Sequence, residues 1–99
     1  MTITRINQFE AKASLEEKLY SFLQSVISVI ETCPGCISCG LLRSTESPAC
    51  LAIIEEWESI EAHQRAASAV PRASLAEAPA WFAKPPSGVY YKATPLAAG

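Results

Sequence analysis

The single histidine of the chain, His63, is the residue best suited to acid–base chemistry. An unperturbed imidazole titrates near neutral pH, so it can remove a proton from a phenolic hydroxyl group at physiological pH. His63 lies three residues after Ile60 and four before Ala67, a spacing that predicts one inward stripe of a helix. Inward histidines are also common core residues, so the spacing leaves both a general base and a core residue open.

Four cysteines lie between residues 33 and 50, and the rest of the chain has none. Cys33, Cys36 and Cys39 have the C-x-x-C-x-x-C spacing of iron–sulfur and zinc ligands, with Cys50 as a fourth candidate. We expect no metal, because Cys36 and Cys39 fall on a predicted strand and would face opposite sides of a sheet. A reversible disulfide between Cys33 and Cys36 stays open, since a tight turn brings them close.

Two candidates for binding a substrate stand at the end of the predicted strand 50–57. Trp57 could form a flat wall for an aromatic substrate, or it could be a core residue that seals the edge of the sheet. Its indole N–H would seek an acceptor in either role. Glu55 shares its face, and a buried carboxylate there needs a partner, for which Arg5 is the expected cation.

Aromatic residues near the C-terminus supply two further candidates. Tyr90 and Tyr91 must point to opposite faces of the last strand, so one of them should reach the site. Tyr91 is taken as the substrate-binding candidate, although the pattern leaves the choice between the two open. Trp81, followed by Phe82, could form a lid over the pocket or could simply pack in the core.

Six main elements must position these residues. Strands are predicted over residues 3–9, 37–43, 50–57 and 89–93. One helix should begin at Ser14, whose capping box with Glu17 satisfies two backbone N–H groups, and a second should begin at Ser59. A third helical piece is expected from about Ser74. The first helix carries the strongest structural signal, an apolar stripe of Leu15, Leu19, Phe22, Leu23, Val26, Ile27 and Ile30.

The order strand, helix, strand, strand, helix, strand predicts an α+β fold of the ferredoxin-like type, with a four-stranded antiparallel sheet. Two helices can cover only one face of such a sheet. The other face would then expose Ala52, Ile54 and similar residues to water, which is unfavourable for a monomer. We therefore expect a homodimer in which a second sheet lies against this face.

Length and composition limit the class of protein. The 99 residues predict a single domain over residues 1–99, with an ordered core over about 3–93 and a tail over 94–99. Hydrophobic residues make up 49% of the chain, which is enough for an apolar core. The formal charge is −2, and no cluster of Lys and Arg of the kind that binds nucleic acid occurs in the sequence. No segment is long and apolar enough to span a membrane, and no secretory leader is recognised, so a cytoplasmic protein is expected.

Two sequence motifs carry a resemblance to a known family. Pro34-Gly35-Cys36 leads into a strand, and Ile54-Glu55-Glu56-Trp57-Glu58-Ser59 leads into Glu61-Ala62-His63. In this order and position they resemble the antibiotic-biosynthesis monooxygenase domain, over residues 3 to 91. The resemblance implies a dimeric α/β barrel. Members of the family that the chain resembles include oxygenases of polyphenols and quinols that use no metal or flavin.

The resemblance also implies roles for particular residues. Asn7 and Trp57 match positions that line the pocket in the oxygenases, where an amide can hold a substrate oxygen. Haem-degrading relatives carry a histidine about ten residues after the tryptophan, where this chain has Ala67, so haem degradation is not expected. We therefore expect a cofactor-independent monooxygenase acting on a small phenol- or quinol-like compound, with Asn7 and His63 as catalytic residues. The alternative is a non-catalytic dimeric domain that binds a small molecule or stabilises an assembly.

Overall fold

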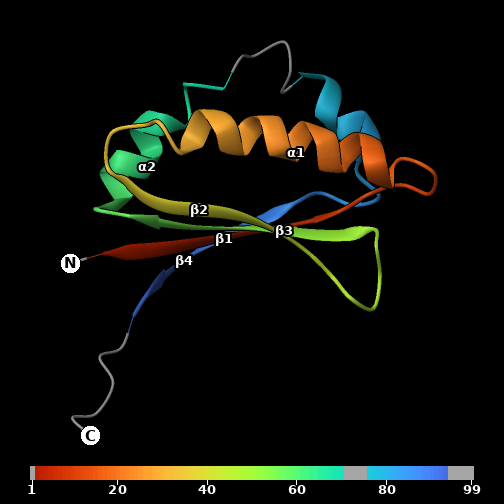
Figure 1. Ribbon diagram of the computed structural model, residues 1–99, viewed down its shortest axis with the longest axis horizontal. Coiled ribbons are helices and arrows are strands. Elements are labelled where there is room, and N and C mark those ends of the chain that lie inside the picture. Colours follow the sequence, from red (N-terminus) through yellow and green to blue (C-terminus); the bar gives the residue numbers. More distant parts are fainter. Residues whose placement is uncertain (1, 71–75, 94–99) are drawn as a thin grey trace, which may run out of the picture.

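The computed structural model of the protein describes residues 2–70 and 76–93. The chain follows the order strand, helix, strand, strand, helix, short 3-10 helix, strand (Figure 1). The elements are β1 (Ile3–Glu10), α1 (Glu16–Ile30), β2 (Cys36–Arg43), β3 (Cys50–Trp57), α2 (Ile60–Ala66), η1 (Ala78–Trp81) and β4 (Ser87–Lys92). The predicted β-α-β-β-α-β order is confirmed.

The four strands form one antiparallel sheet in the order β2-β3-β1-β4, so β1 and β3 are central and β4 is an edge strand. Both helices lie on the same side of this sheet (Figure 1). The ferredoxin-like α+β fold is thus confirmed for the single chain. In the part of the chain that the structure describes, no helix is long and apolar enough to cross a membrane.

The apolar core forms where the predicted stripe of α1 meets the sheet. Leu19 and Leu23 are buried against Leu51 and Ile53 of β3 and against Ala11. Burial on β3 alternates strictly, because successive side chains of a strand point to opposite faces. Residues 51, 53, 55 and 57 therefore face the helices, as the sequence predicts.

The two helix starts differ from each other. Ser59 caps α2 as predicted, since its hydroxyl oxygen accepts a hydrogen bond from the backbone N–H of Ala62 at 3.1 Å. The predicted cap at Ser14 is wrong. Ser14 has a φ of 71°, and α1 begins two residues later at Glu16, without a side-chain cap. The backbone N–H of Ser14 instead donates to the Glu16 carboxylate at 3.2 Å.

A bulge in β2 changes the direction of two cysteines. Cys36 pairs with Trp57 and Cys39 pairs with Glu55, with the register shift lying between Cys36 and Ser38. In a regular strand, residues three positions apart point to opposite faces, but the extra residue of the bulge cancels this difference. The side chains of Cys36 and Cys39 therefore both point to the helix side of the sheet. The prediction that they face opposite sides of the sheet is wrong.

The face of the sheet away from the helices keeps apolar side chains on its surface. Leu42, Ile54, Val89 and Tyr91 are each between 39% and 52% exposed. A hollow of about 390 Å³ lies toward the β2–β3 hairpin, bordered by Gln8, Leu42, Cys50, Ala52, Lys84 and Ser87 among others.

Two expectations fall partly or wholly beyond the described ranges. The third helical piece was predicted from about Ser74; Ser74 and Leu75 lie outside the described residues, whereas η1 covers its end at Trp81. The predicted tail over residues 94–99 also lies outside them.

Candidate functional site

The strand register brings a row of polar side chains together at the α2 end of the helix-covered face. Glu55 on β3 pairs with Arg5 on β1, and Arg5 in turn pairs with Tyr90 on β4. Asn7 lies two residues along β1 on the same face, and Trp57 follows Glu55 on β3. The predicted neighbourhood of β1 and β3 is the reason why these side chains meet.

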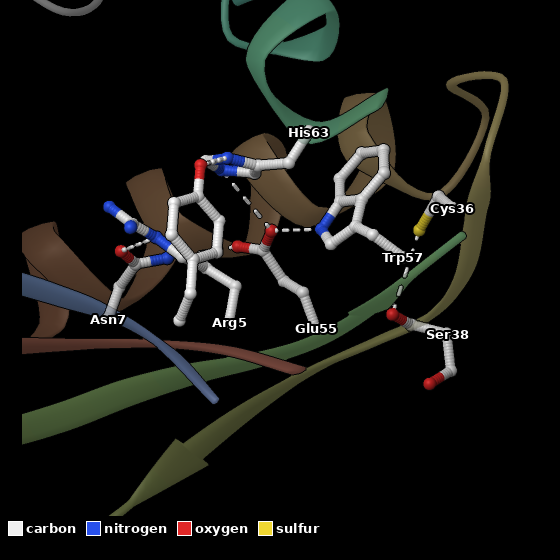
Figure 2. A network of polar contacts seen from close by, with 8 residues as sticks. Arg5, Asn7, Cys36, Ser38, Glu55, Trp57 and His63 are labelled. Carbon is white, nitrogen blue, oxygen red and sulfur yellow. Dashed lines mark hydrogen bonds and ion pairs between the residues drawn. The ribbon is translucent and has the colours of Figure 1, made fainter. Parts of the chain in front are cut away.

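Glu55 is the centre of this row, and its side chain is 1% exposed. One carboxylate oxygen, Oε1, accepts a hydrogen bond from the indole N–H of Trp57 at 2.7 Å. The other, Oε2, accepts from the side-chain amide of Asn7 at 3.0 Å (Figure 2). Two donors on neighbouring strands thus compensate for part of the cost of burying a carboxylate.

His63 approaches the same carboxylate from α2 (Figure 2). Its Nε2 lies 3.8 Å from Oε1 of Glu55, and its Nδ1 lies 2.5 Å from the hydroxyl oxygen of Tyr90. The imidazole ring also packs edge-on against the rings of Trp57 and Tyr90. His63 therefore links Tyr90 to Glu55.

Arg5 completes the row without touching Glu55 directly. Its Nε donates to the amide oxygen of Asn7 at 3.1 Å, and its guanidinium carbon lies 4.5 Å from the centre of the Tyr90 ring. The expected pairing of Glu55 with Arg5 is replaced by a bridge through Asn7. Gly88 gives this arrangement room, because a Cβ there would collide with Arg5 and with the amide oxygen of Asn7.

Burial changes the acidity of both central groups. It raises the pKa of Glu55 above the ordinary value of 4.5, although the Trp57 hydrogen bond, the Arg5 charge and the Asn7 hydrogen bond oppose this shift. Burial also lowers the pKa of His63 below its ordinary 6.5, and the positive charge of Arg5 adds to this effect. His63 is therefore a neutral imidazole near pH 7 and is able to accept a proton.

A small cavity of about 40 Å³ lies beside Trp57 and His63, with Ile30, Ala66, Ala67 and Val70 completing its lining. Trp57 itself is fully buried and packs against Ala62 and Ala66. A cavity of this size is far below the roughly 300 Å³ of an ordinary ligand pocket. Asn7 is not part of its lining, and it is connected to His63 through their shared partner Glu55.

Two predicted substrate-binding residues lie elsewhere. Tyr91 pairs with Thr4 and is 50% exposed on the face away from the helices, so Tyr90 and not Tyr91 reaches the site. Trp81 packs edge-on against Phe22 of α1, in the apolar cluster around Leu19 rather than beside Trp57. To decide between Tyr90 and Tyr91 from the sequence, one would need the register of β4 against β1, and no sequence motif determines that register.

The cysteines do not add a metal centre to the described part of the chain. All four, which lie within the described ranges, are free thiols. Within residues 2–70 and 76–93, no three His, Cys, Asp or Glu side chains lie close enough together to hold a metal ion. Burial, followed by the nearby charge of Glu55, raises the pKa of Cys39 to about 12. Cys39 is therefore protonated near neutral pH and acts as a filler beneath the helices.

The model of one protein family, antibiotic biosynthesis monooxygenase, matches residues 2–70 of the chain. This chain belongs to that family. The match contains the whole of the Glu55–Trp57 and His63 segment and ends before β4, so it includes every residue of the site except Tyr90. Membership supports a monooxygenase-type function, and it leaves the substrate undefined. No curated protein shows significant sequence similarity to the chain.

Solved structures share the fold of this family member at low sequence identity. Rv0793 from Mycobacterium tuberculosis is 18% identical, with a TM-score of 0.85 over 99% of this chain and 100% of that chain. A conserved protein from Methanosarcina mazei Go1 is 17% identical, with a TM-score of 0.86 over 95% and 94%. SnoaB from Streptomyces nogalater, a cofactor-independent oxygenase, is 18% identical, with a TM-score of 0.80 over 96% and 95%.

Proposed function

We propose that this protein is a cofactor-independent monooxygenase that oxidises a small phenol- or quinol-like compound. The observation that carries the proposal is the 3.8 Å contact between Nε2 of His63 and the buried carboxylate of Glu55, both within the segment that the family model matches. SnoaB, which shares the fold, is a cofactor-independent oxygenase. A site of this kind needs a base, and it leaves the electron transfer to the substrate.

The proposed reaction begins when the site removes a proton from a hydroxyl group of the substrate. The resulting anion is electron-rich and transfers one electron to dioxygen, which gives a substrate radical and superoxide. These two combine to form a carbon–oxygen bond and, after protonation, a hydroperoxide. Loss of water from the hydroperoxide leaves a quinone carbonyl, so one oxygen atom enters the product and the other leaves as water.

Each polar residue has a proposed part in the first step. His63 takes up the proton, and the carboxylate of Glu55, 3.8 Å from Nε2, stabilises the imidazolium that forms. Asn7 holds Glu55 in place, because its amide is already committed to that carboxylate and to Arg5. Trp57 supports the same carboxylate from the core, and its ring borders the small cavity.

Oxygen uptake with a series of quinols and naphthols tests this function. The assay is run in the presence of a chelator and without added flavin, and products are identified by mass spectrometry with ¹⁸O₂. We expect His63→Ala to lower turnover by roughly 10²-fold or more, since general base catalysis contributes that much. Gln64→Ala, an exposed neighbour on α2, is the matched control. Turnover that is equal in the His63 and Gln64 variants would remove His63 from the mechanism.

The active unit in this proposal is a homodimer formed through the open face of the sheet. Leu42, Ile54, Val89 and Tyr91 lie exposed on that face, and a second copy of the sheet would cover them. A stable interface of this type buries roughly 2,000 Å² or more in total. Sedimentation equilibrium should give a dimer at micromolar concentration and a monomer for Ile54→Lys. A monomeric wild-type protein would contradict this assembly.

A second candidate function is a non-catalytic dimeric domain that binds a small molecule or stabilises an assembly. The small volume beside Trp57 and His63 favours it, because about 40 Å³ does not accommodate an aromatic ring unless side chains move. The same oxygen-uptake assay separates the two candidates. Binding of quinols without any oxygen consumption would favour the non-catalytic domain.

A further inference from the structure

We propose that Tyr90 is the catalytic residue that meets the substrate hydroxyl group, and that it passes a proton to His63. This role rests on the proposed function, and it assigns the first proton transfer to a residue outside the segment matched by the family model.

The first step of the argument is the protonation of the imidazole. A neutral imidazole carries one hydrogen, on either Nδ1 or Nε2. Nε2 faces the carboxylate of Glu55 at 3.8 Å, where a lone pair would be repelled and an N–H would be attracted. The hydrogen therefore belongs on Nε2. Nδ1 is then an acceptor, and its partner at 2.5 Å is the hydroxyl group of Tyr90, which donates.

The second step follows from the lone pairs that remain. In this tautomer Nε2 has no lone pair, and the lone pair of Nδ1 is already occupied by Tyr90. A substrate hydroxyl group therefore has no direct access to a basic nitrogen of His63 while Tyr90 stays in place. The hydroxyl oxygen of Tyr90, by contrast, receives no hydrogen bond from any residue that the structure describes. It keeps lone pairs with which it can accept a substrate O–H.

The third step is the position of Tyr90 at the outer end of the contacts. Glu55 is buried on a central strand, whereas Tyr90 is half-buried and comes from the edge strand β4. Arg5 lies over the Tyr90 ring at 4.5 Å from its centre. A cation in this place stabilises negative charge that develops on the phenol during transfer.

The transfer is balanced, because only protons move and no atom changes its oxidation state. The O–H bond of the substrate breaks and a new O–H bond forms on Tyr90. At the same time the original O–H bond of Tyr90 breaks and an N–H bond forms on Nδ1 of His63. The products are a substrate anion, a neutral tyrosine and an imidazolium beside the Glu55 carboxylate.

The first test is spectroscopic and uses the fact that His63 is the only histidine. Two-bond ¹H–¹⁵N NMR spectra of the ¹⁵N-labelled protein are recorded at a pH at which the imidazole is neutral. They report which ring nitrogen of His63 carries the hydrogen. We expect the Nε2–H tautomer in the wild type and a changed Nδ1 signal in Tyr90→Phe. Tyr20→Phe, a tyrosine on α1 away from the site, should leave the spectrum unchanged. A wild-type Nδ1–H tautomer would overturn the proposal.

The second test uses 4-nitrophenol, whose phenolate absorbs visible light, and measures the ionised fraction of the bound phenol. The wild type should increase ionisation over the free compound, and Tyr90→Phe should lose that increase while Tyr20→Phe retains it. Equal ionisation in the wild type and in Tyr90→Phe, or no ionisation by the wild type, would overturn the role of Tyr90. Circular dichroism checks that each variant is folded.

Oxygen uptake then separates this inference from the proposed function. If the wild type oxidises quinols, Tyr90→Phe should lower turnover by roughly 10²-fold or more. Oxidation that proceeds equally well in Tyr90→Phe would overturn the inference and leave the oxygenase intact. Ionisation of 4-nitrophenol that depends on Tyr90, without oxidation of any quinol, would support the inference and contradict the oxygenase.

Discussion

At one end of the helix-covered sheet face, Leu51 and Ile53 pack under Leu19 and Leu23, whereas two residues further along the same strand the chain presents Glu55 and Trp57. Both ends follow one strand alternation and both are closed to water. They differ only in what fills the space. The apolar end gains stability in proportion to the area it buries, about 25 cal/mol per Å².

The polar end has no such simple gain. Its carboxylate loses hydration, and the two hydrogen bonds from Trp57 and Asn7 return only part of that loss. A core that served stability alone would continue the pattern of Leu51 and Ile53. The interruption of the apolar pattern, rather than the hollow of about 390 Å³ near the β2–β3 hairpin, therefore marks the candidate site.

The largest expected effect concerns the two tryptophans, one at each end. Trp57 is fully buried, so Trp57→Ala should lower the free energy of unfolding by about 3–5 kcal/mol. Trp81 is only partly buried, and Trp81→Ala should cost less. Urea unfolding measures both.

If Trp57→Ala does not fold, Trp57→Phe gives the same comparison in a milder form. It keeps an aromatic ring but removes the donor to Glu55, and it should cost about 1–3 kcal/mol. Equal losses for the variants of Trp57 and Trp81 would break the distinction between the ends.

An intermediate effect is expected at Asn7. Asn7→Ala removes the donor to Glu55 and the acceptor of Arg5, and it should lower the free energy of unfolding by about 1–3 kcal/mol. Gln8→Ala is the matched control, because Gln8 is the next residue of β1 and is exposed on the other face. Both variants are compared by thermal and urea unfolding. Indistinguishable stabilities for the two would mean that the Asn7 contacts contribute nothing.

The smallest expected effect is a change of slope with pH. Since the pKa of Glu55 is raised on folding, the folded state holds a proton that the unfolded state has released above pH 4.5. The wild type therefore loses stability as pH rises from 4.5 toward the raised pKa. Glu55→Gln lacks this loss, so its stability relative to the wild type should increase with pH over that interval.

His63 acts in the opposite sense and contacts Glu55, so the two proteins are also compared with His63→Ala in both, where the difference isolates Glu55. The lowered pKa of His63 makes the folded state bind fewer protons than the unfolded state below pH 6.5, and that contribution to stability falls as pH falls. Glu56→Gln, on the exposed face of the same strand, reports the loss of a carboxylate alone. A difference curve for Glu55→Gln that does not rise with pH would refute the raised pKa.

Much of the fold could be predicted because periodicity acts over many residues. The α1 stripe, the helix-facing positions of β3 and the Ser59 cap were predicted correctly, since each depends on side chains close in sequence. The continuous apolar run at the start of β3 suggested burial on both faces, whereas in the single chain only the helix side is fully buried. The helix start predicted at Ser14 was wrong, because a local capping pattern contains no information about the turn in which Ser14 lies. The β2 bulge was missed because one extra residue leaves no mark on composition, yet it reversed the direction of Cys36 relative to Cys39.

The site was predictable only in part, and for a related reason. Sequence pattern placed Glu55, Trp57 and Asn7 on adjacent strands, and the structure brings them together through Glu55. The partner of His63 depends on the register between β1 and β4, whose paired residues are 79 to 89 positions apart in the sequence. That register selected Tyr90 over Tyr91, and no short motif encodes it.

Gly88 has a consequence for how this site could change during evolution. A side chain at residue 88 would push aside the guanidinium group of Arg5 and the amide oxygen of Asn7. Both groups are the ends of side chains that can move, so a change at residue 88 would act on the site through the contacts of Arg5 and Asn7. A mutational screen should therefore find that the effect of a change at residue 88 is smaller in a protein that already has a smaller residue at position 5 or 7.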